Sequence, residues 1–483
     1  MSDATGTATT GAETDTATGA ETDTAAGTAT DTTAGTGPDT ATATDTTRGT
    51  DTTTETTVSV RMYNVGFGDC FVVTVSRGDQ VWRMLVDCGV HSQGRAKVDG
   101  VSRTIAEVVK AVIADLTAVT QAGSPPRFDV VVATHHHQDH ITGFAVPDWE
   151  TVEVGEVIVP FVEDPADKDA RALRNSLVSA ATKLNGIIEA TAKRKERSGS
   201  GFTDALSLAN SFAINSMGNA AATDRLLHQN GRHFLEPTHD IFFAPDRDPA
   251  KNVLPTPIDG VNIHILGPSR DPKQLSLMNP PASAEWLQLD PDQGLEDDDT
   301  PALFPAIYVV PDDEHDELPD ELTKARASLR LSQLATSDEA LLGAAAVLER
   351  SVNNTSVYFV LDVAGTRLLF VGDSQEGAWE HVLGDAESRE LVSNVAFYKI
   401  GHHGSHNATP KSFVDSVLGD GAYAMLPWGL VKKWADTIPK AELLAALAEH
   451  KTHLIRADAP VADTPQVEVG PGQLWSQVTF TVL

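Results

Sequence analysis

The stretch VVATHHHQDHITG, residues 131–143, places four histidines and an aspartate directly after a β-branched apolar run. The run predicts a buried strand, and its carboxyl end is where ligand sites of α/β folds gather. Because alternate side chains of an extended segment point the same way, His135, His137 and Asp139 can converge, and His140 follows from the turn. Such imidazoles and carboxylates suit zinc, manganese or iron, although a polar loop whose histidines only cap hydrogen bonds is the alternative. The clustering favours a metal site.

The sequence before this segment has the pattern of strands, a crossover helix and a further strand. Residues 58–89 contain three short β-rich runs separated by glycine-containing turns. Residues 101–120 predict an amphipathic helix, and Thr104 and Glu107 have the spacing of a capping box. The run FDVVVAT at 128–134 then returns to a buried strand. The apolar face of the helix consists of Ile105, Val108, Val109, Val112, Leu116 and Val119.

Two later strand ends carry the same kinds of side chain. Asp373 ends the hairpin SVYFVLDVAGTRLLFVGDS, in which Ala364 and Gly365 lie near the turn. His402 and His403 follow another strand in NVAFYKIGHHGSH, and GAYAMLPWG and QVTFTVL predict two more strands. An aspartate at a strand end is usually a cap, and two histidines before a glycine can be incidental. Three such ends in one chain make a shared metal site the more economical interpretation.

The order HxHxDH, then a strand-terminal GD, then HHGS resembles the metallo-β-lactamase superfamily. The runs NVGFGDCFVV and LVDCG narrow this resemblance to one branch. That branch contains the metallohydrolase domain of the DNA-uptake competence channel protein and a phosphorylcholine esterase. The resemblance covers roughly residues 58–160 and 351–483. It implies an α/β fold, the αββα sandwich, with a dinuclear metal site at the edges of the sheets.

The resemblance also implies roles for residues at matching positions. The expected cofactors are two divalent metal ions, with zinc favoured and manganese or iron as alternatives. His402 would face the substrate as an oxyanion contact, and Asp139 would hold or accept a proton. The implied metal ligands are His135 and His137 for the first metal, Asp139, His140 and His403 for the second, and Asp373 as the bridge.

One position departs from the pattern of the superfamily, in which a further histidine ligand often precedes the GD hairpin. Here that region reads SVNNTSVYF, so Asn353 and Asn354 stand near the expected place and could be weak metal or substrate contacts. An amide oxygen is a weaker ligand than imidazole, so the first metal would be loosely held. Alternatively, His228, His233 or His239 could reach in from an insertion, although each is more often a surface or core residue.

Two aspartates and two cysteines lie beside the first strands. We expect Asp69 and Asp87 to contact the metal ligands and orient them without binding metal, rather than to have a purely structural role. Cys70 and Cys88 are the only cysteines, which excludes a disulfide framework and a cysteine-rich zinc module. Both are expected to be buried as small apolar residues.

Composition divides the chain into a tail and a folded domain. Residues 1–57 are almost entirely Thr, Ala, Gly and acidic residues, with TGAETDTA twice in succession, and they offer almost nothing apolar to bury. We expect this tail to be disordered. Residues 58–483 would form the hydrolase domain, with helical insertions at about 164–252 and 275–350. Helices are expected within the first insertion at residues 166–197 and 202–217.

The charge limits the partners that we expect. The net charge is −32, and the tail, with ten acidic residues against one arginine, leaves −23 on the folded domain. This charge argues against general capture of polyanions by long-range attraction, so any contact with a nucleic acid would have to be local. The one dense basic patch is KRKER at 193–197. No signal peptide or membrane-length apolar segment occurs, so we expect a cytoplasmic protein without membrane contact.

These observations predict a metal-dependent hydrolase that uses a metal-bridging hydroxide. Phosphodiesters of nucleotides or nucleic acids are the preferred substrates, because the HHGS branch resembles phosphoesterases and nucleases. Hydrolysis of a lactam or thioester stays open, since the same water can attack a carbonyl. A partner-binding effector module that keeps the fold is a third interpretation, which the near-complete ligand set disfavours. The sequence does not indicate any protein partner.

Overall fold

The computed structural model describes residues 55–92, 94–98, 101–198, 203–246, 249–277, 338–431 and 438–482. Most of the predicted tail and of the second predicted insertion lies outside these residues. The tail boundary at residue 57 is wrong, because strand β1 begins at Thr56. Thr56 and Thr57 are β-branched and pair with strands on both sides, opposite Arg77 and Ser76 on one side and Val482 and Thr481 on the other.

Within the described residues, eight strands form the first sheet in the order β16-β17-β1-β2-β3-β6-β7-β8. Its antiparallel part contains the three predicted N-terminal strands and β17, the last strand of the chain. From β3 through β6 and β7 to β8 the neighbours are parallel. The strands are β1 (Thr56–Tyr63), β2 (Cys70–Arg77), β3 (Gln80–Cys88), β6 (Arg127–Val132), β7 (Glu153–Pro160), β8 (His239–Phe243), β16 (Val467–Val469) and β17 (Trp475–Val482).

The second sheet repeats this division into an antiparallel and a parallel part. Its described strands have the order β15-β14-β13-β12-β11-β10-β9. The predicted hairpin is β11 and β12, and Ala364 and Gly365 both take positive φ in its turn, as a two-residue hairpin turn requires. A separate small hairpin joins β4 (Ala96–Val98) to β5 (Val101–Arg103). The strands of the second sheet are β9 (Val253–Pro255), β10 (Val261–Gly267), β11 (Tyr358–Val363), β12 (Thr366–Phe370), β13 (Phe397–Lys399), β14 (Tyr423–Leu426) and β15 (His453–Arg456).

The two sheets share one apolar core, whose buried residues come from both. In β3, Met84 and Val86 belong to this shared core, whereas Leu85 between them packs with helix α1 on the other face. This alternation follows from the period of two of an extended chain. A third cluster joins the other face of the second sheet to α9, α11 and α12. The described chain is therefore a mixed α/β structure with two mixed sheets and helices.

The helices begin close to where the sequence predicts them. Helix α1 starts after Thr104, and Thr104 and Glu107 form the predicted capping box. Val119 does not belong to its buried face, because it lies at the C-cap and is 61% exposed. The helices near the sheets are α1 (Ile105–Ala118), α2 (Gln138–Ile141), α5 (Ala220–Leu226), α6 (Pro272–Ser276), α9 (Glu376–Gly384), α10 (Ala386–Leu391), α11 (Lys411–Ser416), α12 (Ala441–Glu449) and the one-turn η10 (Gly401–Gly404).

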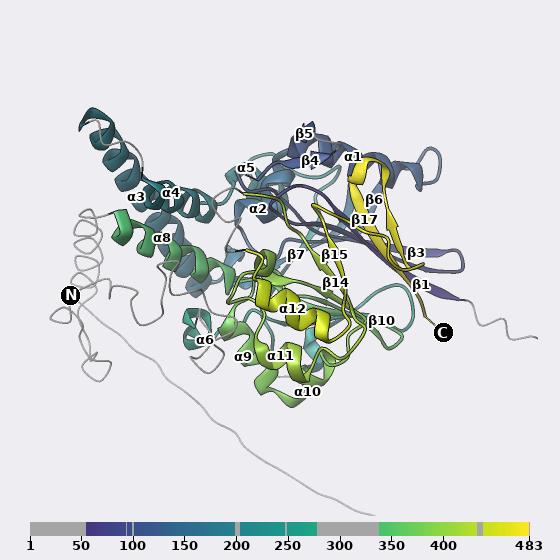
Figure 1. The fold of residues 1–483 in the computed structure, drawn as a ribbon. Helices are drawn as coiled ribbons and strands as arrows, with labels where there is room; N and C mark the ends of the chain where they lie inside the picture. Colours follow the sequence, from purple (N-terminus) through teal and green to yellow (C-terminus); the bar gives the residue numbers. More distant parts are fainter. Residues whose placement is uncertain are drawn as a thin grey trace, which may run out of the picture. The chain divides into compact units, whose positions relative to one another are not determined.

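Three further helices, α3 (Lys168–Ser198), α4 (Asp204–Ser216) and α8 (Asp338–Asn353), pack together around a small apolar cluster (Figure 1). The first two confirm the helices predicted at 166–197 and 202–217. The carboxylate of Asp338 in α8 contacts Lys195 of α3 and Thr203, the N-cap of α4. One member of the predicted basic patch is thus used in an internal ion pair. No helix in the described part of the chain is long and apolar enough to span a bilayer.

Candidate metal centre

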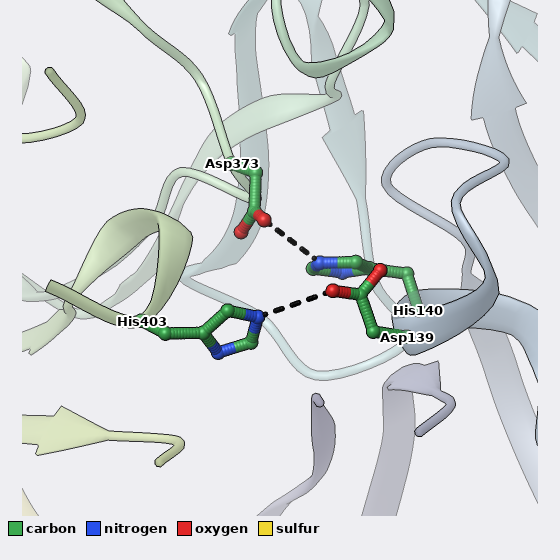
Figure 2. A group of neighbouring side chains, drawn as sticks. All are labelled: Asp139, His140, Asp373 and His403. Carbon is green, nitrogen blue, oxygen red and sulfur yellow. Dashed lines mark hydrogen bonds and ion pairs between the residues drawn. The ribbon is translucent and has the colours of Figure 1, made fainter. Parts of the chain in front are cut away.

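Side chains from three separate strand ends meet in one buried cluster. Asp139 and His140 lie in α2 after β6, Asp373 follows β12, and His403 lies in η10 after β13. One ligand atom from each of the four side chains lies within 4.8 Å of the others (Figure 2). The structure thus brings together residues that the sequence places in three distant motifs.

The three consecutive histidines point alternately, as an extended segment predicts. Nε2 of His135 lies 3.0 Å from Nδ1 of His137, beside the cluster. His136 points the other way, and its Nδ1 lies 3.1 Å from Oε1 of the buried Glu163. The predicted alternation does not extend to Asp139, because His137 is the N-cap of α2. Asp139 therefore reaches the cluster from the first turn of a helix and not from extended chain.

The segments 68–69 and 87–89, which lie at the start of β2 and at the end of β3, hold helix α2 in place. The backbone N–H of Asp69 donates to the carbonyl of Asp139 at 3.0 Å, and Gly89 N–H donates to the Asp69 carbonyl at 2.9 Å. A Cβ on Gly89 would lie 2.5 Å from the backbone nitrogen of His140, so only glycine allows this approach. The close backbone contact fixes the direction in which Asp139 and His140 leave α2.

Three histidines each have one ring nitrogen committed to the protein. Nδ1 of His140 lies 2.8 Å from Asp87, Nδ1 of His403 lies 2.6 Å from the carbonyl of Pro427, and Nδ1 of His135 lies 3.1 Å from the Thr134 hydroxyl. These acceptors place a proton on Nδ1, so that in the neutral imidazole Nε2 keeps a lone pair for a cation. Asp87 also accepts from the backbone and hydroxyl of Thr134, at 2.7 and 2.8 Å.

The Nε2 atoms of two of these histidines face carboxylate oxygens. Nε2 of His140 lies 3.1 Å from Oδ2 of Asp373, and Nε2 of His403 lies 3.4 Å from Oδ2 of Asp139 (Figure 2). Lone pairs at these distances repel unless a proton or a cation lies between them. Oδ1 of Asp139 is buried and has no hydrogen-bond partner among the described residues. This set of converging imidazole nitrogens and carboxylate oxygens fits divalent cations such as zinc.

Burial and charge set the protonation of the cluster. Burial, followed by the neighbouring His140, lowers the pKa of His135 well below its ordinary value, and burial lowers that of His137 to about 4. Burial also opposes the charged form of His140, but the carboxylates led by Asp373 outweigh it and raise the His140 pKa. Burial raises the pKa of Asp373, yet His140 and Lys399 reverse this and lower it. Asp373 thus stays ionised and attracts positive charge.

Lys399, which the sequence analysis missed, lies inside the centre. Its Nζ is 2.6 Å from Oδ2 of Asp69, 3.1 Å from Oδ1 of Asp373 and 2.6 Å from the carbonyl of Gly372. Burial disfavours its charge, but Asp69 and Asp373 outweigh burial and raise its pKa. Asp69 thus supports the centre through Lys399. The available signal was a charged residue in the apolar run AFYKIG, because a buried ammonium needs a partner.

Glu349 was also missed, and it holds His402. Oε1 of Glu349, in α8, lies 3.1 Å from Nε2 of His402, and both side chains are largely buried. The His402 backbone N–H donates to Oδ1 of Asp373 at 3.0 Å, in a turn where His402 and His403 both take positive φ. Burial opposes the charge on His402, but Glu349 outweighs it and raises the His402 pKa to about 9. The only sequence signal for this role is that Glu349 lies four residues before Asn353, which places the two side chains on one face of a helix.

The two asparagines of the predicted weak site have different surroundings. Asn353 lies beside Glu349 and His402, with Nδ2 at 3.4 and 3.5 Å from them, and its Oδ1 has no partner among the described residues. Asn354 does not face the cluster. Its side chain donates to carbonyls near α6, the shortest bond being 2.7 Å to Leu277, and it accepts from Gln375 N–H. Asn354 therefore anchors a loop instead of offering a ligand.

The histidines of the first insertion do not join the cluster. Nε2 of His228 lies 2.9 Å from Asp240, His233 contacts the carbonyl of Phe234, and His239 lies on the surface. None of them belongs to the groups of metal-ligating side chains found among the described residues. In comparisons with known proteins, the chain matches no protein-family model and no curated protein.

Proposed function

We propose that this chain is a metal-dependent hydrolase of the metallo-β-lactamase superfamily that cleaves phosphodiesters. Two mixed sheets with a shared core, and helices packed on their other faces, support the αββα sandwich of that superfamily. The observation that carries the proposal is the cluster of Asp139, His140, Asp373 and His403, whose buried ligand atoms converge and among which Oδ1 of Asp139, Nε2 of His140 and Oδ2 of Asp373 accept or donate no hydrogen bond within the described residues.

Two divalent cations, zinc or alternatively manganese or iron, would occupy the centre. His135 and His137, with Asn353 nearby, would hold one cation. Asp139, His140 and His403 would hold the other, and Asp373 would lie between them. When bound, these cations would supply Lewis-acid activation of water and of the substrate oxygen.

The protein's own groups would orient the reaction. Oδ1 of Asp139 lacks a partner among the described residues and would accept a hydrogen bond or a proton from the attacking water. The ion pair with Glu349 keeps His402 cationic and fixes its ring. Nδ1 of His402 also lacks a partner there, so it would donate to an anionic substrate oxygen. A phosphodiester carries such an oxygen before and during reaction, which favours it over an uncharged lactam or thioester.

Substrate profiling after controlled metal loading tests this proposal. The chelated protein is reloaded with Zn²⁺, Mn²⁺ or Fe²⁺ and assayed on bis(p-nitrophenyl) phosphate, a cyclic dinucleotide, single-stranded DNA, a lactam and a thioester. We expect hydrolysis of phosphodiesters only in the loaded protein. His403→Ala should lower the rate by about 10²–10⁴-fold, whereas the surface control His239→Ala should not change it. A protein that retains no metal and hydrolyses none of these substrates would contradict the proposal.

A further inference from the structure

Lys399 is the one ammonium that contacts the carboxylates of the described centre, and it is 2% exposed. It ends the short strand β13, between the fully buried Tyr398 and Ile400. Its Nζ donates hydrogen bonds to the Gly372 carbonyl and to Oδ1 of Asp373, and it forms an ion pair with Asp69. The other groups in β13 and η10 that can carry positive charge are the imidazoles of His402, which pairs with Glu349, and His403, which faces Asp139.

The two carboxylate oxygens of Asp373 have different partners, and Lys399 binds only one of them. Oδ1 receives Nζ of Lys399 at 3.1 Å and the backbone N–H of His402 at 3.0 Å. Oδ2 faces Nε2 of His140 at 3.1 Å and accepts no hydrogen bond from the described residues (Figure 2). The carboxylate therefore cannot turn without breaking two bonds to Oδ1. Asp69 is likewise held at 2.6 Å by the same ammonium.

The charges explain why this ammonium is needed. Asp69, Asp87, Asp139 and Asp373 are all buried at 1–3% exposure, within contact of the same imidazoles. Burying several carboxylates together is costly unless positive charge lies among them. Among the described residues, His140 and Lys399 both contact Asp69 and Asp373, but only the ammonium of Lys399 carries a charge that is independent of an imidazole.

We propose that Lys399 is the internal counter-ion of the centre, which allows Asp69 and Asp373 to be buried before metal binds and turns Asp373 so that only Oδ2 faces the cation. It is a positioning residue and does not touch substrate. The proposal rests on the proposed function only for the cation that meets Oδ2. The counter-ion role itself concerns the metal-free chain.

A thermal-unfolding cycle in the presence of EDTA tests the counter-ion role. It compares the full-length protein with Lys399→Met, Asp69→Asn and the double variant. Lys399→Met keeps an unbranched apolar stem but removes the charge, and we expect its midpoint to fall by about 5–10 °C. Asp69→Asn in the same chain removes the carboxylate that Lys399 neutralises. The double variant should therefore recover at least half of the loss, which a packing role of the lysine would not produce.

The matched control is Lys451→Met, because Lys451 is also paired with an aspartate, Asp420 at 2.7 Å, but is 77% exposed. Its midpoint should change by no more than about 1 °C. Adding Zn²⁺ gives a second measurement. The midpoint of Lys399→Met should rise by more degrees than that of the wild type, because the cation replaces the missing charge. A wild type that zinc does not stabilise would count against the proposed function and leave the EDTA cycle to decide the role of Lys399.

Equal losses in Lys399→Met and the double variant would overturn the proposal, since they would show that only the stem of Lys399 matters. If Lys399→Met does not fold in EDTA, the double variant decides. Folding of the double variant supports the counter-ion role, and its failure to fold contradicts it.

Discussion

Two buried histidine–glutamate pairs in this molecule have the same separation but different surroundings. His136 and Glu163 are 3.1 Å apart, and so are His402 and Glu349. The second oxygen of Glu163 lies 3.1 Å from the guanidinium of Arg174, so the charge of that carboxylate is already matched. His402 instead lies beside the carboxylate of Asp373, through its own backbone N–H. The same side-chain pair thus serves as a structural bond in one place and orients a site residue in the other.

The largest difference between the pairs should be in turnover. Glu349→Gln removes the charge that holds the His402 ring, so we expect kcat to fall by about 10–100-fold while the metal content stays unchanged. Glu163→Gln should leave kcat within about twofold, because Glu163 lies on the opposite side of the histidine segment. Steady-state kinetics on bis(p-nitrophenyl) phosphate and elemental analysis measure both. Glu349→Asp should recover part of the rate, and equal rates for Glu349→Gln and the wild type would show that the pair is only structural.

The two pairs should also differ, by a smaller effect, in stability. Here the substitution of Glu163 should have a larger effect than that of Glu349. Glu163→Gln leaves the Arg174 guanidinium without its carboxylate and weakens the bond to His136, so the free energy of unfolding should fall by about 1–3 kcal/mol at neutral pH. Urea unfolding of the metal-free protein measures this. The exposed ion pair between Lys193 and Glu189 provides the control, and Glu189→Gln should cost no more than about 0.5 kcal/mol. An unchanged unfolding midpoint for Glu163→Gln would show that Arg174 and His136 do not need this carboxylate.

The smallest effect concerns the pH dependence of that stability difference. Burial raises the pKa of Glu163, but His136 and then Arg174 reverse this and hold it below its ordinary value of 4.5. A carboxylate with a lowered pKa stabilises the fold above its unfolded pKa and loses this contribution as the pH falls through its folded pKa. The gap between the wild type and Glu163→Gln should therefore shrink as the pH falls below about 4.5. Urea midpoints on both sides of this pH check it, and a gap that widened in acid would contradict the sign.

Much of the centre could be predicted because its signals are local. A β-branched run followed by HHHQDH, a hairpin that ends in GD and a strand that ends in HH each identify a strand end with ligating side chains. The structure brings Asp139, His140, Asp373 and His403 together from these ends. Helix α1 could be predicted equally well, because its capping box and the periodic spacing of its apolar residues lie within a few turns.

The residues and strands that the sequence did not predict correctly depend on long-range contacts or lie in short, ambiguous apolar runs. Asn353 and Asn354 are equivalent in sequence, yet one faces His402 and the other binds carbonyls near α6, and neither partner is close in the chain. Glu349 looks like any helical glutamate until His402, 53 residues later, lies against it. Strands β7 and β10 were not predicted, and β8 lies within the segment 164–252 that was predicted to be a helical insertion, because a short apolar run does not by itself distinguish a strand from a helix.

The sequence by itself determined the kinds of ligand atom and the strand ends that carry them, because periodicity and turn chemistry act over a few residues. Only the tertiary structure decided which buried charges neutralise one another. The pairing of Lys399 with Asp69 joins β13 of the second sheet to the loop before β2 of the first, and the pairing of Glu349 with His402 joins α8 to η10. Electrostatic energy depends on distance in space and on burial, and neither quantity is encoded by position along the chain.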